Sequence, residues 1–303
     1  MSLRRGLLNW YLRRTEKPYL ARVSDPETVR RSFEKNARRF FHGPRGAAYA
    51  SGEIAGLPVL SVRGPGVAEG DGPLILYFHG GGYVFGSPRT HRAMLAFLSR
   101  EAACPACLPD YPKAPEAPFP AAFEAALAVY RAMMDRPGGI VLGGDSAGGG
   151  LALALLGEIC RLDLPRPRGC FAMSPLTDLT GSGESLTRNA ALDALLPAER
   201  AAELLDLYLQ GAAPDDPRAS PLCAEFRGAC PVWLCAGDTE IMLDDTRRMA
   251  AHLRDHGVPV TEVIAHDLPH VWPIFHNILP EARHTLADIA AWITSLSRET
   301  SDN

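Results

Sequence analysis

The sequence predicts an α/β fold with a mostly parallel central sheet that helices cover on both faces. From Leu57 onward, short unbroken apolar runs alternate with stretches of helical periodicity, and Gly or Pro bounds most of the runs. An apolar run without polar alternation is typical of a strand buried on both faces, as in a parallel sheet. The expected strands are Leu74–Phe78, Ile140–Leu142, Cys170–Met173, Val232–Cys235 and Val260–Ile264. The expected helices between them are Arg89–Arg100, Ala121–Met134, Leu151–Arg161, Asp244–His256 and Ala282–Leu296.

The segment before this alternation is expected to be helical. Leu3, Leu7 and Tyr11 share one helical face, and Asp25 followed by Pro26 is a typical start for a second helix that continues to about residue 40. The first helix is basic and could lie on a membrane surface. Packing over the main body of the protein is the preferred interpretation.

A second segment is also expected to leave the sheet. The interval 176–229 contains a loop and a helical pattern, Pro197–Leu209, but no convincing strand. An interval of this length in a compact domain is expected to lie over part of the domain rather than to belong to the sheet. The sequence therefore divides into a helical cap segment, 1–45, and an α/β domain, 46–303, in which 177–228 contributes a second part of the cap.

Composition narrows the class of protein. Of the 303 residues, 47% are hydrophobic and 22% are charged, as in an ordinary globular protein, and no apolar run is long enough to span a bilayer. The net charge of −4 gives no support to nucleic-acid binding. Seven cysteines fit reduced thiols better than a disulfide framework, so a cytoplasmic location is expected. Cys104 and Cys107 have the spacing of a metal motif but lack a second pair, and no metal is expected.

The strongest local motif is Gly144-Asp-Ser-Ala-Gly148, which lies between an expected strand and an expected helix. A serine on a sharp strand-to-helix turn needs small neighbours, and the helix that follows directs its positive end at the reacting centre. Ser146 is therefore the candidate nucleophile.

A second glycine motif, His79-Gly-Gly-Gly82, directly follows the strand that ends at Phe78. Three glycines leave backbone N–H groups accessible to a substrate, which is the requirement of an oxyanion hole. A phosphate-binding loop is the alternative, but neither the Walker pattern nor the dinucleotide fingerprint is present.

A serine nucleophile needs a histidine base, and His270 follows the last expected strand in the segment Asp267-Leu-Pro-His-Val-Trp272. His266 is the nearest rival, but it abuts the strand. A metal site made by these two histidines lacks further ligands. The other histidines that lie in helical or terminal segments are expected to be surface or packing residues: His42, His91, His252, His256, His276 and His284.

The acid that orients the histidine is expected after the strand Val232–Cys235. Asp238 and Glu240 both lie on the turn there, whereas Asp244 and Asp245 are expected to begin the next helix. The chain order of serine, acid and histidine is the order found in hydrolases whose serine lies on such a strand-to-helix turn. The residues alone leave Asp238 and Glu240 open.

The motifs together resemble those of the bacterial hormone-sensitive-lipase-like esterases, an α/β-hydrolase family. The resemblance rests on His79–Gly82, Gly144–Gly148, Asp110–Pro120 and Pro269–Trp272, which occur in the family's order. The similarity covers the chain from about Leu74 to the last helix, and the N-terminal helices resemble the family's cap. The segment Glu16–Arg22 is more faintly similar to a branch of monoterpene lactone hydrolases.

The resemblance implies a serine carboxylesterase that acts on short- to medium-chain acyl esters without a cofactor. Ser146 would be the nucleophile and His270 the base, and the oxyanion donors would be the N–H groups of Gly81, Gly82 and Ala147. His79 would brace the glycine loop. Three further residues would hold the structure near the site: Tyr111, Pro115 and Glu116.

This sequence departs from the family pattern at two places. Pro112-Lys113 stands where the family often has Arg-Leu, which puts an internal salt bridge there in doubt. Glu240-Ile-Met242 stands where many members have Asp-Pro-Leu at the triad acid, so we prefer Glu240 over Asp238. Lactone hydrolysis with the same triad is the alternative activity, and a non-catalytic role in binding a small molecule is a further alternative.

The expected partner is a small-molecule ester, without nucleic acid or stable membrane insertion, and the resemblance allows a homodimer. Leu3, Leu7, Trp10, Phe33 and Phe40 are available to line a pocket.

Overall fold

The computed structural model describes residues 2–296. Its centre is an eight-stranded sheet with the order β1-β2-β4-β3-β5-β6-β7-β8. The six strands from β4 to β8 run parallel to one another, and β1 and β2 join them by antiparallel pairing. The strands are β1 Ala48–Ile54, β2 Leu57–Arg63, β3 Leu74–Phe78, β4 Ala106–Pro109, β5 Ile140–Asp145, β6 Gly169–Met173, β7 Val232–Gly237 and β8 Val260–Ala265. The predicted α/β-hydrolase fold, with its mostly parallel sheet, is confirmed.

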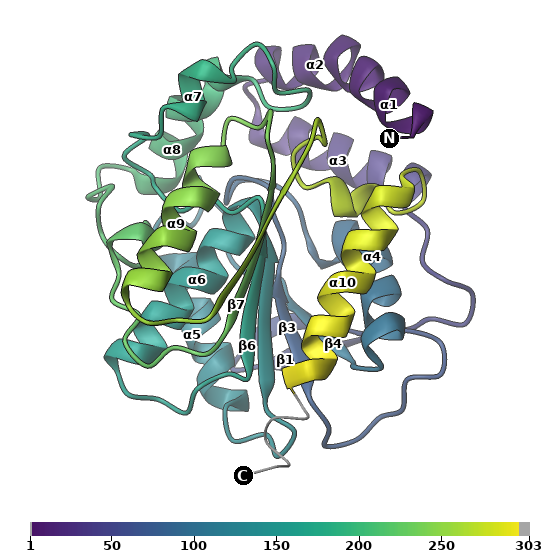
Figure 1. Ribbon diagram of the computed structural model, residues 1–303, viewed down its shortest axis with the longest axis vertical. Coiled ribbons are helices and arrows are strands. Elements are labelled where there is room, and N and C mark those ends of the chain that lie inside the picture. The colour runs from purple at the N-terminus through teal and green to yellow at the C-terminus, as the bar shows by residue number, and fades with distance from the viewer. Residues whose placement is uncertain (1, 297–303) are drawn as a thin grey trace.

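Helices lie on both faces of this sheet (Figure 1). They are α1 Leu3–Arg14, α2 Glu16–Arg22, α3 Pro26–Phe40, α4 Pro88–Ala102, α5 Ala121–Met133, α6 Ser146–Arg161, α7 Ser185–Arg188, α8 Ala201–Leu209, α9 Leu243–Asp255 and α10 Pro280–Leu296. Short 3-10 helices are η1 Ala198–Arg200, η2 Pro221–Cys223 and η3 Trp272–Phe275. The five helices expected between the strands are all present, with ends that differ by up to five residues from the expected ones.

Side chains along each strand point alternately to the two faces of the sheet, and a separate hydrophobic core covers each face. On β3, Leu76 and Phe78 pack with α5, α6 and α9, whereas Ile75 and Tyr77 pack with α4 and α10 on the other face. Consecutive strand residues point to opposite faces, so an unbroken apolar run buries both. This double burial is the reason that the apolar runs predicted strands correctly.

The N-terminal region contains three helices rather than two. Asp25 caps α3 by accepting a hydrogen bond from the N–H of Thr28 at 3.0 Å. The helix α1 packs on the body through Leu8 and Leu12. Leu3, Leu7 and Tyr11, which the sequence places on one helical face, are all exposed, and the buried stripe lies beside them.

The helices α1, α2, α7 and α8 lie at the same end of the sheet, above the carboxyl ends of the parallel strands (Figure 1). In the described part of the chain, no helix is both long and apolar enough to cross a membrane. The segments that directly follow β3, β5, β7 and β8 lie at this end of the sheet, and they contain the glycine motifs and the residues of the expected triad.

Candidate active site

Ser146 lies at the junction of β5 and α6. Its φ of +52° is a left-handed conformation that residues other than glycine rarely adopt. The turn is crowded: a Cβ at Gly148 would lie 2.1 Å from the carbonyl oxygen of Phe78. The helix α6 begins at Ser146 itself, five residues before the expected start, so its positive end is directed at the serine.

His270 and Glu240 form a buried pair. His270 Nδ1 donates to Glu240 Oε2 at 2.7 Å, and the two side chains are only 5% and 1% exposed. The other carboxylate oxygen of Glu240 accepts from Ser174 Oγ at 2.9 Å and from the N–H of Gly237 at 2.5 Å. These bonds fix the carboxylate, and the carboxylate in turn fixes the tautomer and the orientation of the imidazole.

The environment of His270 has opposing effects on its pKa. Burial lowers the pKa, but the hydrogen bond and the negative charge of Glu240 raise it, and the net shift is upward. Its Nε2 has no hydrogen-bond partner among the described residues. Ser146 and His270 line the same cavity, and no direct hydrogen bond joins them in this structure. In a free enzyme such a bond is often long and tightens only when substrate binds.

Asp238 has a different partner. Its carboxylate lies 2.7 Å from His266 Nδ1 and accepts a hydrogen bond from the N–H of Asp267 at 2.7 Å. Burial would raise the pKa of Asp238, but these hydrogen bonds outweigh it and the net shift is downward. The two carboxylates left open by the sequence thus serve two histidines, and Glu240 is the one against His270.

The glycine loop lies beside Ser146. Gly81 has a φ of +123°, and a Cβ there would lie 2.2 Å from the carbonyl oxygen of Phe85. In the described part of the chain, the N–H groups of Gly81 and Gly82 have no hydrogen-bond partner. The N–H of Ala147 belongs to the first turn of α6, which has no intrahelical acceptor. Three donors are therefore available next to the serine.

Two aromatic rings brace this loop. His79 Nδ1 lies 2.8 Å from the carbonyl oxygen of Gly80, and Tyr111 Oη donates to the carbonyl oxygen of His79 at 2.6 Å. The rings of His79 and Tyr111 stack with centroids 4.3 Å apart. Tyr111 therefore holds the backbone of the loop.

Sequence reasoning missed a second brace, which involves Asp145. Its Oδ1 accepts from Tyr77 Oη at 2.6 Å and from the N–H of Gly80 at 3.0 Å, and His91 Nε2 lies 3.3 Å away. His91 is thus not a mere packing residue but a member of this buried network. The only signal in the sequence was the position of Asp145 beside the serine.

The segment after Tyr111 contacts the N-terminal helix α3. Glu116 forms an ion pair with Arg30 of α3 at 2.7 Å, and Arg30 also donates to the carbonyl oxygen of Ala114. Lys113, at the position where the family often has leucine, pairs with Asp110 at 2.7 Å. Glu116 and Ala114 thus link this segment to the N-terminal helix α3.

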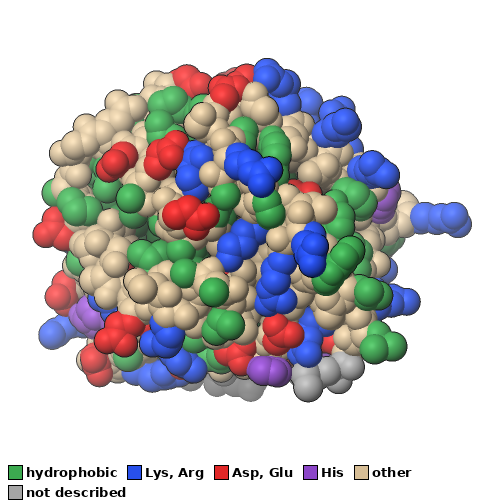
Figure 2. Space-filling view, turned by 90° about the horizontal axis from the view of Figure 1, so that it is seen from above, with side chains coloured by type: hydrophobic (Ala, Val, Ile, Leu, Met, Phe, Trp, Pro, Cys, Tyr) green, Lys and Arg blue, Asp and Glu red, His purple; other side chains and the backbone are tan. Residues whose placement is uncertain are grey.

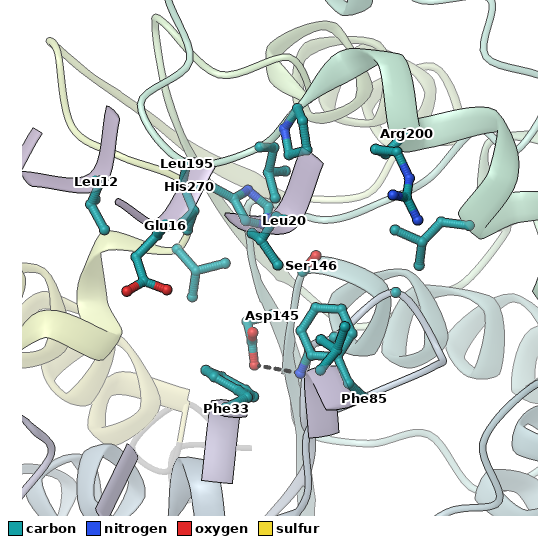
Figure 3. Close-up of a pocket in the computed structure, with 18 of the residues that line it drawn as sticks. Leu12, Glu16, Leu20, Phe33, Phe85, Asp145, Ser146, Leu195, Arg200 and His270 are labelled. Atoms are coloured by element: carbon teal, nitrogen blue, oxygen red, sulfur yellow. Dashed lines mark hydrogen bonds between the residues drawn. The ribbon is translucent and has the colours of Figure 1, made fainter. Parts of the chain in front are cut away.

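A cavity of about 620 Å³ connects these groups. Figure 3 shows Ser146 and His270 facing the same space, with Leu20 of α2 on one side and Phe33 and Phe85 on another. The 177–228 segment supplies further apolar walls, Leu195, Leu204 and Leu205. Of the five residues expected to line a pocket, Leu7, Phe33 and Phe40 do so; Leu3 and Trp10 do not, because their side chains point to the surface.

No group of three His, Cys, Asp or Glu side chains in residues 2–296 is arranged to hold a metal ion. Cys104 and Cys107 are both buried, and burial raises the pKa of each thiol to about 12. These thiols are packing groups on and beside β4.

The chain is similar to known proteins along most of its length. Residues 75–274 match the model of a family with the α/β-hydrolase fold. An acetyl-hydrolase from Streptomyces hygroscopicus is 35% identical over 235 residues, which are 77% of this chain and 79% of that protein. An esterase from Acinetobacter venetianus is 37% identical over 227 residues, which are 74% of this chain and 75% of that protein.

Solved structures agree. The crystal structure of an esterase from the bacterial hormone-sensitive lipase family has a TM-score of 0.91 at 34% identity, and the match covers 98% of this chain and 99% of the other. The structure of EstE5 soaked with p-nitrophenyl butyrate has a TM-score of 0.92 at 34% identity, covering 98% of this chain and 100% of the other. The family resemblance predicted from the sequence is confirmed. The chain belongs to the hormone-sensitive-lipase-like esterases of the α/β-hydrolase fold family.

Proposed function

We propose that this protein is a serine carboxylesterase in which Ser146, His270 and Glu240 act as the catalytic triad. The observation that carries the proposal is the buried pair of His270 and Glu240. His270 Nε2 has no hydrogen-bond partner among the described residues, and His270 lines the same cavity as Ser146. The names of the relatives support the reaction class, because proteins similar to this chain are called esterases and acetyl-hydrolases.

In the first step, His270 Nε2 accepts the proton of Ser146 as the serine oxygen attacks the ester carbonyl carbon. The carbonyl oxygen becomes negative and accepts hydrogen bonds from the N–H groups of Gly81, Gly82 and Ala147. The tetrahedral intermediate collapses, the alcohol leaves with the proton from His270, and an acyl group stays on Ser146. Glu240 stabilises the imidazolium that exists between these transfers.

In the second step, water takes the place of the alcohol. His270 accepts a proton from water, the hydroxide oxygen attacks the acyl carbon, and the carboxylic acid leaves as Ser146 regains its proton. The donors of the oxyanion hole act again. Because they are held by the backbone before substrate arrives, the loop does not have to reorganise during either step.

The expected substrates are short- to medium-chain acyl esters. A cavity of about 620 Å³ with mostly apolar walls has room for a small acyl chain and an alcohol, but few groups that would recognise a polar substrate. We propose that residues 1–45 and 177–228 form the cap that sets this preference. Contacts between the two segments support a joint cap: Lys17 Nζ donates to the carbonyl oxygens of Ala190 and Asp193 at 2.7 and 2.8 Å.

A cytoplasmic location and a homodimer remain predictions from the sequence and the resemblance. The seven cysteines are free thiols in the structure, which fits a reducing compartment. Size-exclusion chromatography with light scattering measures the oligomeric state directly.

The test is hydrolysis of p-nitrophenyl esters of increasing acyl length, with a terpene lactone in the same panel. Ser146→Ala is the test variant, and Ser51→Ala, an exposed serine of β1, is the matched control. We expect activity that is greatest on short acyl chains, unchanged in Ser51→Ala and absent in Ser146→Ala. Faster turnover of the lactone would favour the alternative activity. A folded protein that turns over none of these compounds would contradict the proposal and favour a binding role.

A further inference from the structure

The exposed apolar side chains of this protein gather on the cap. Residues 2–296 contain seven large hydrophobic side chains that are exposed, and five of them are on α1 and α3: Leu3, Leu7, Trp10, Tyr11 and Phe40. A sixth, Leu192, is adjacent, because its carbonyl oxygen accepts a hydrogen bond from Arg13 of α1 at 2.9 Å. We call these six residues the cap face.

The helix α1 has two apolar stripes with different environments. Leu8 and Leu12 pack on the body, whereas Leu3, Leu7 and Trp10 are 90%, 68% and 60% exposed. Their spacing of four and three residues places the exposed three on one side of the helix. A stripe of this kind is costly in water and is typical of a contact surface.

The cap segment carries a strong positive charge, although Arg5 and Arg13 of α1 are paired with Asp267 of the body at 3.4 and 3.9 Å. Residues 1–45 contain 12 Lys and Arg against four Asp and Glu, a net charge of +8, whereas the rest of the chain contains 19 against 31, a net charge of −12. Arg14 and Arg38 are exposed beside the apolar residues, and the guanidinium of Arg39 lies over the ring of Phe40 at 5.3 Å. Figure 2 looks down on the cap, and Lys and Arg side chains dominate the right-hand half, the side on which Figure 1 has α1.

The acids of the cap segment do not neutralise this surface. Glu16 faces the cavity, where burial raises its pKa. Asp25 caps α3, Glu27 pairs with Arg31, and Glu34 accepts a hydrogen bond from Ser87. Each is engaged away from Leu3, Leu7 and Trp10.

The cap face also borders the cavity that contains Ser146. Leu7, Tyr11 and Phe40 are exposed and at the same time line the cavity. They therefore form part of its rim. Whatever covers the cap face covers the entrance for substrate.

We propose that the cap face binds the surface of an anionic phospholipid bilayer, so that the cavity opens toward the lipid. Apolar side chains surrounded by Arg and Lys match the acyl boundary and the negative headgroups of such a surface. A second copy of this chain fits less well, because two faces of like positive charge would meet. Binding is peripheral and reversible, since the six exposed side chains of the cap face do not span the bilayer.

The test is co-sedimentation of the purified protein with vesicles, without substrate, so that the result does not depend on ester hydrolysis. One set of vesicles is phosphatidylcholine alone and the other contains phosphatidylglycerol. The apolar variant is Leu3→Ser with Trp10→Ser, and the charge variant is Arg14→Gln; none of these residues lines the cavity. The matched controls are Tyr49→Ser and Arg227→Gln, which change an exposed ring and an exposed cation elsewhere.

We expect binding to the anionic vesicles that weakens with salt and is slight with phosphatidylcholine alone. Arg14→Gln lowers the affinity about fivefold, and the double variant lowers it roughly tenfold or more; the controls bind as wild type. Equal binding by the controls and the double variant would overturn the proposal. The proposal would also be overturned if the protein did not bind anionic vesicles and formed a dimer that the double variant Leu3→Ser with Trp10→Ser dissociates. The cap face would then be an interface between two copies of the chain.

Discussion

Asp145, the residue before Ser146, accepts a hydrogen bond from the N–H of Gly80 at 3.0 Å. This bond ties the end of β5 to the glycine loop, and the same oxygen also accepts from Tyr77. The serine and its proposed oxyanion donors are therefore held in one rigid unit.

We predict that Asp145→Ala lowers kcat more than it changes KM. The loss of the acceptor leaves the Tyr77 hydroxyl, the N–H of Gly80 and His91 Nε2 without this partner, and each buried donor left unpaired costs about 1–3 kcal/mol in free energy of unfolding. The glycine loop also becomes free to move away from the serine. Asp145→Asn, which keeps an acceptor oxygen, should retain more activity. Steady-state kinetics and urea unfolding of both variants test this, and equal kcat values in the two would refute the bracing role.

The roles of Glu240 and Asp238 can be distinguished by replacing each carboxylate with its amide. Glu240→Gln should lower kcat by about 10⁴-fold, because the neutral amide no longer stabilises the imidazolium or its tautomer. Asp238→Asn should stay within a few-fold of wild type, since its carboxylate faces His266 instead. Kinetics on p-nitrophenyl butyrate measure both. A large loss in Asp238→Asn with little in Glu240→Gln would reverse the assignment.

The pH profile of kcat/KM should report the raised pKa of His270. The base must be neutral to accept the proton, so activity rises with pH through a pKa above the ordinary histidine value. Glu240→Gln removes the negative charge that stabilises the protonated ring. The acidic limb should therefore move to lower pH in the residual activity of that variant. A limb that stays in place would mean that the carboxylate does not control this titration.

The two glycines of the loop should tolerate a methyl group differently. A Cβ at Gly81 would collide with the backbone of Phe85, whereas a Cβ at Gly82 would meet Leu204 Cδ2 at 2.3 Å, the end of a flexible side chain. Gly81→Ala should lower kcat by about 10²–10³-fold, the cost of a displaced oxyanion donor. Gly82→Ala should lower kcat by a smaller factor.

The double variant Gly82→Ala with Leu204→Ala provides the control for this comparison. Removal of the Leu204 side chain frees the space that the new methyl group needs, so kcat should recover relative to Gly82→Ala alone. No recovery would show that the left-handed φ of +59° at Gly82, rather than the contact with Leu204, limits the substitution.

The sequence predicted β3, β5, β6 and β7 because their residues are all buried and include unbroken apolar runs. It did not predict β1 and β2. The residues of β1 are nearly all exposed, so its sequence contains neither an apolar run nor an alternation of apolar and polar residues. The strand β4 was missed because it contains only four residues and follows Pro105. Pairing with β2 and β3, which no local pattern records, makes it a strand.

The residues of the proposed site fall into two groups in the same way. Ser146, His270 and the glycine loop were found from the sequence, because each lies in a local motif at a strand end. The choice between Glu240 and Asp238 depended on which carboxylate the fold turns toward His270. Ser174 and His91 were missed, since one supports Glu240 and the other Asp145 only through contacts between distant segments.

The central claim is that ester hydrolysis passes through an acyl group on Ser146. The most direct measurement is mass spectrometry of the protein quenched in acid during turnover of a slow p-nitrophenyl ester, followed by peptide mapping. The account predicts one acyl group per chain, located on the peptide that contains Ser146 and absent in Ser146→Ala. Turnover without an adduct, or an adduct on another residue, would contradict it.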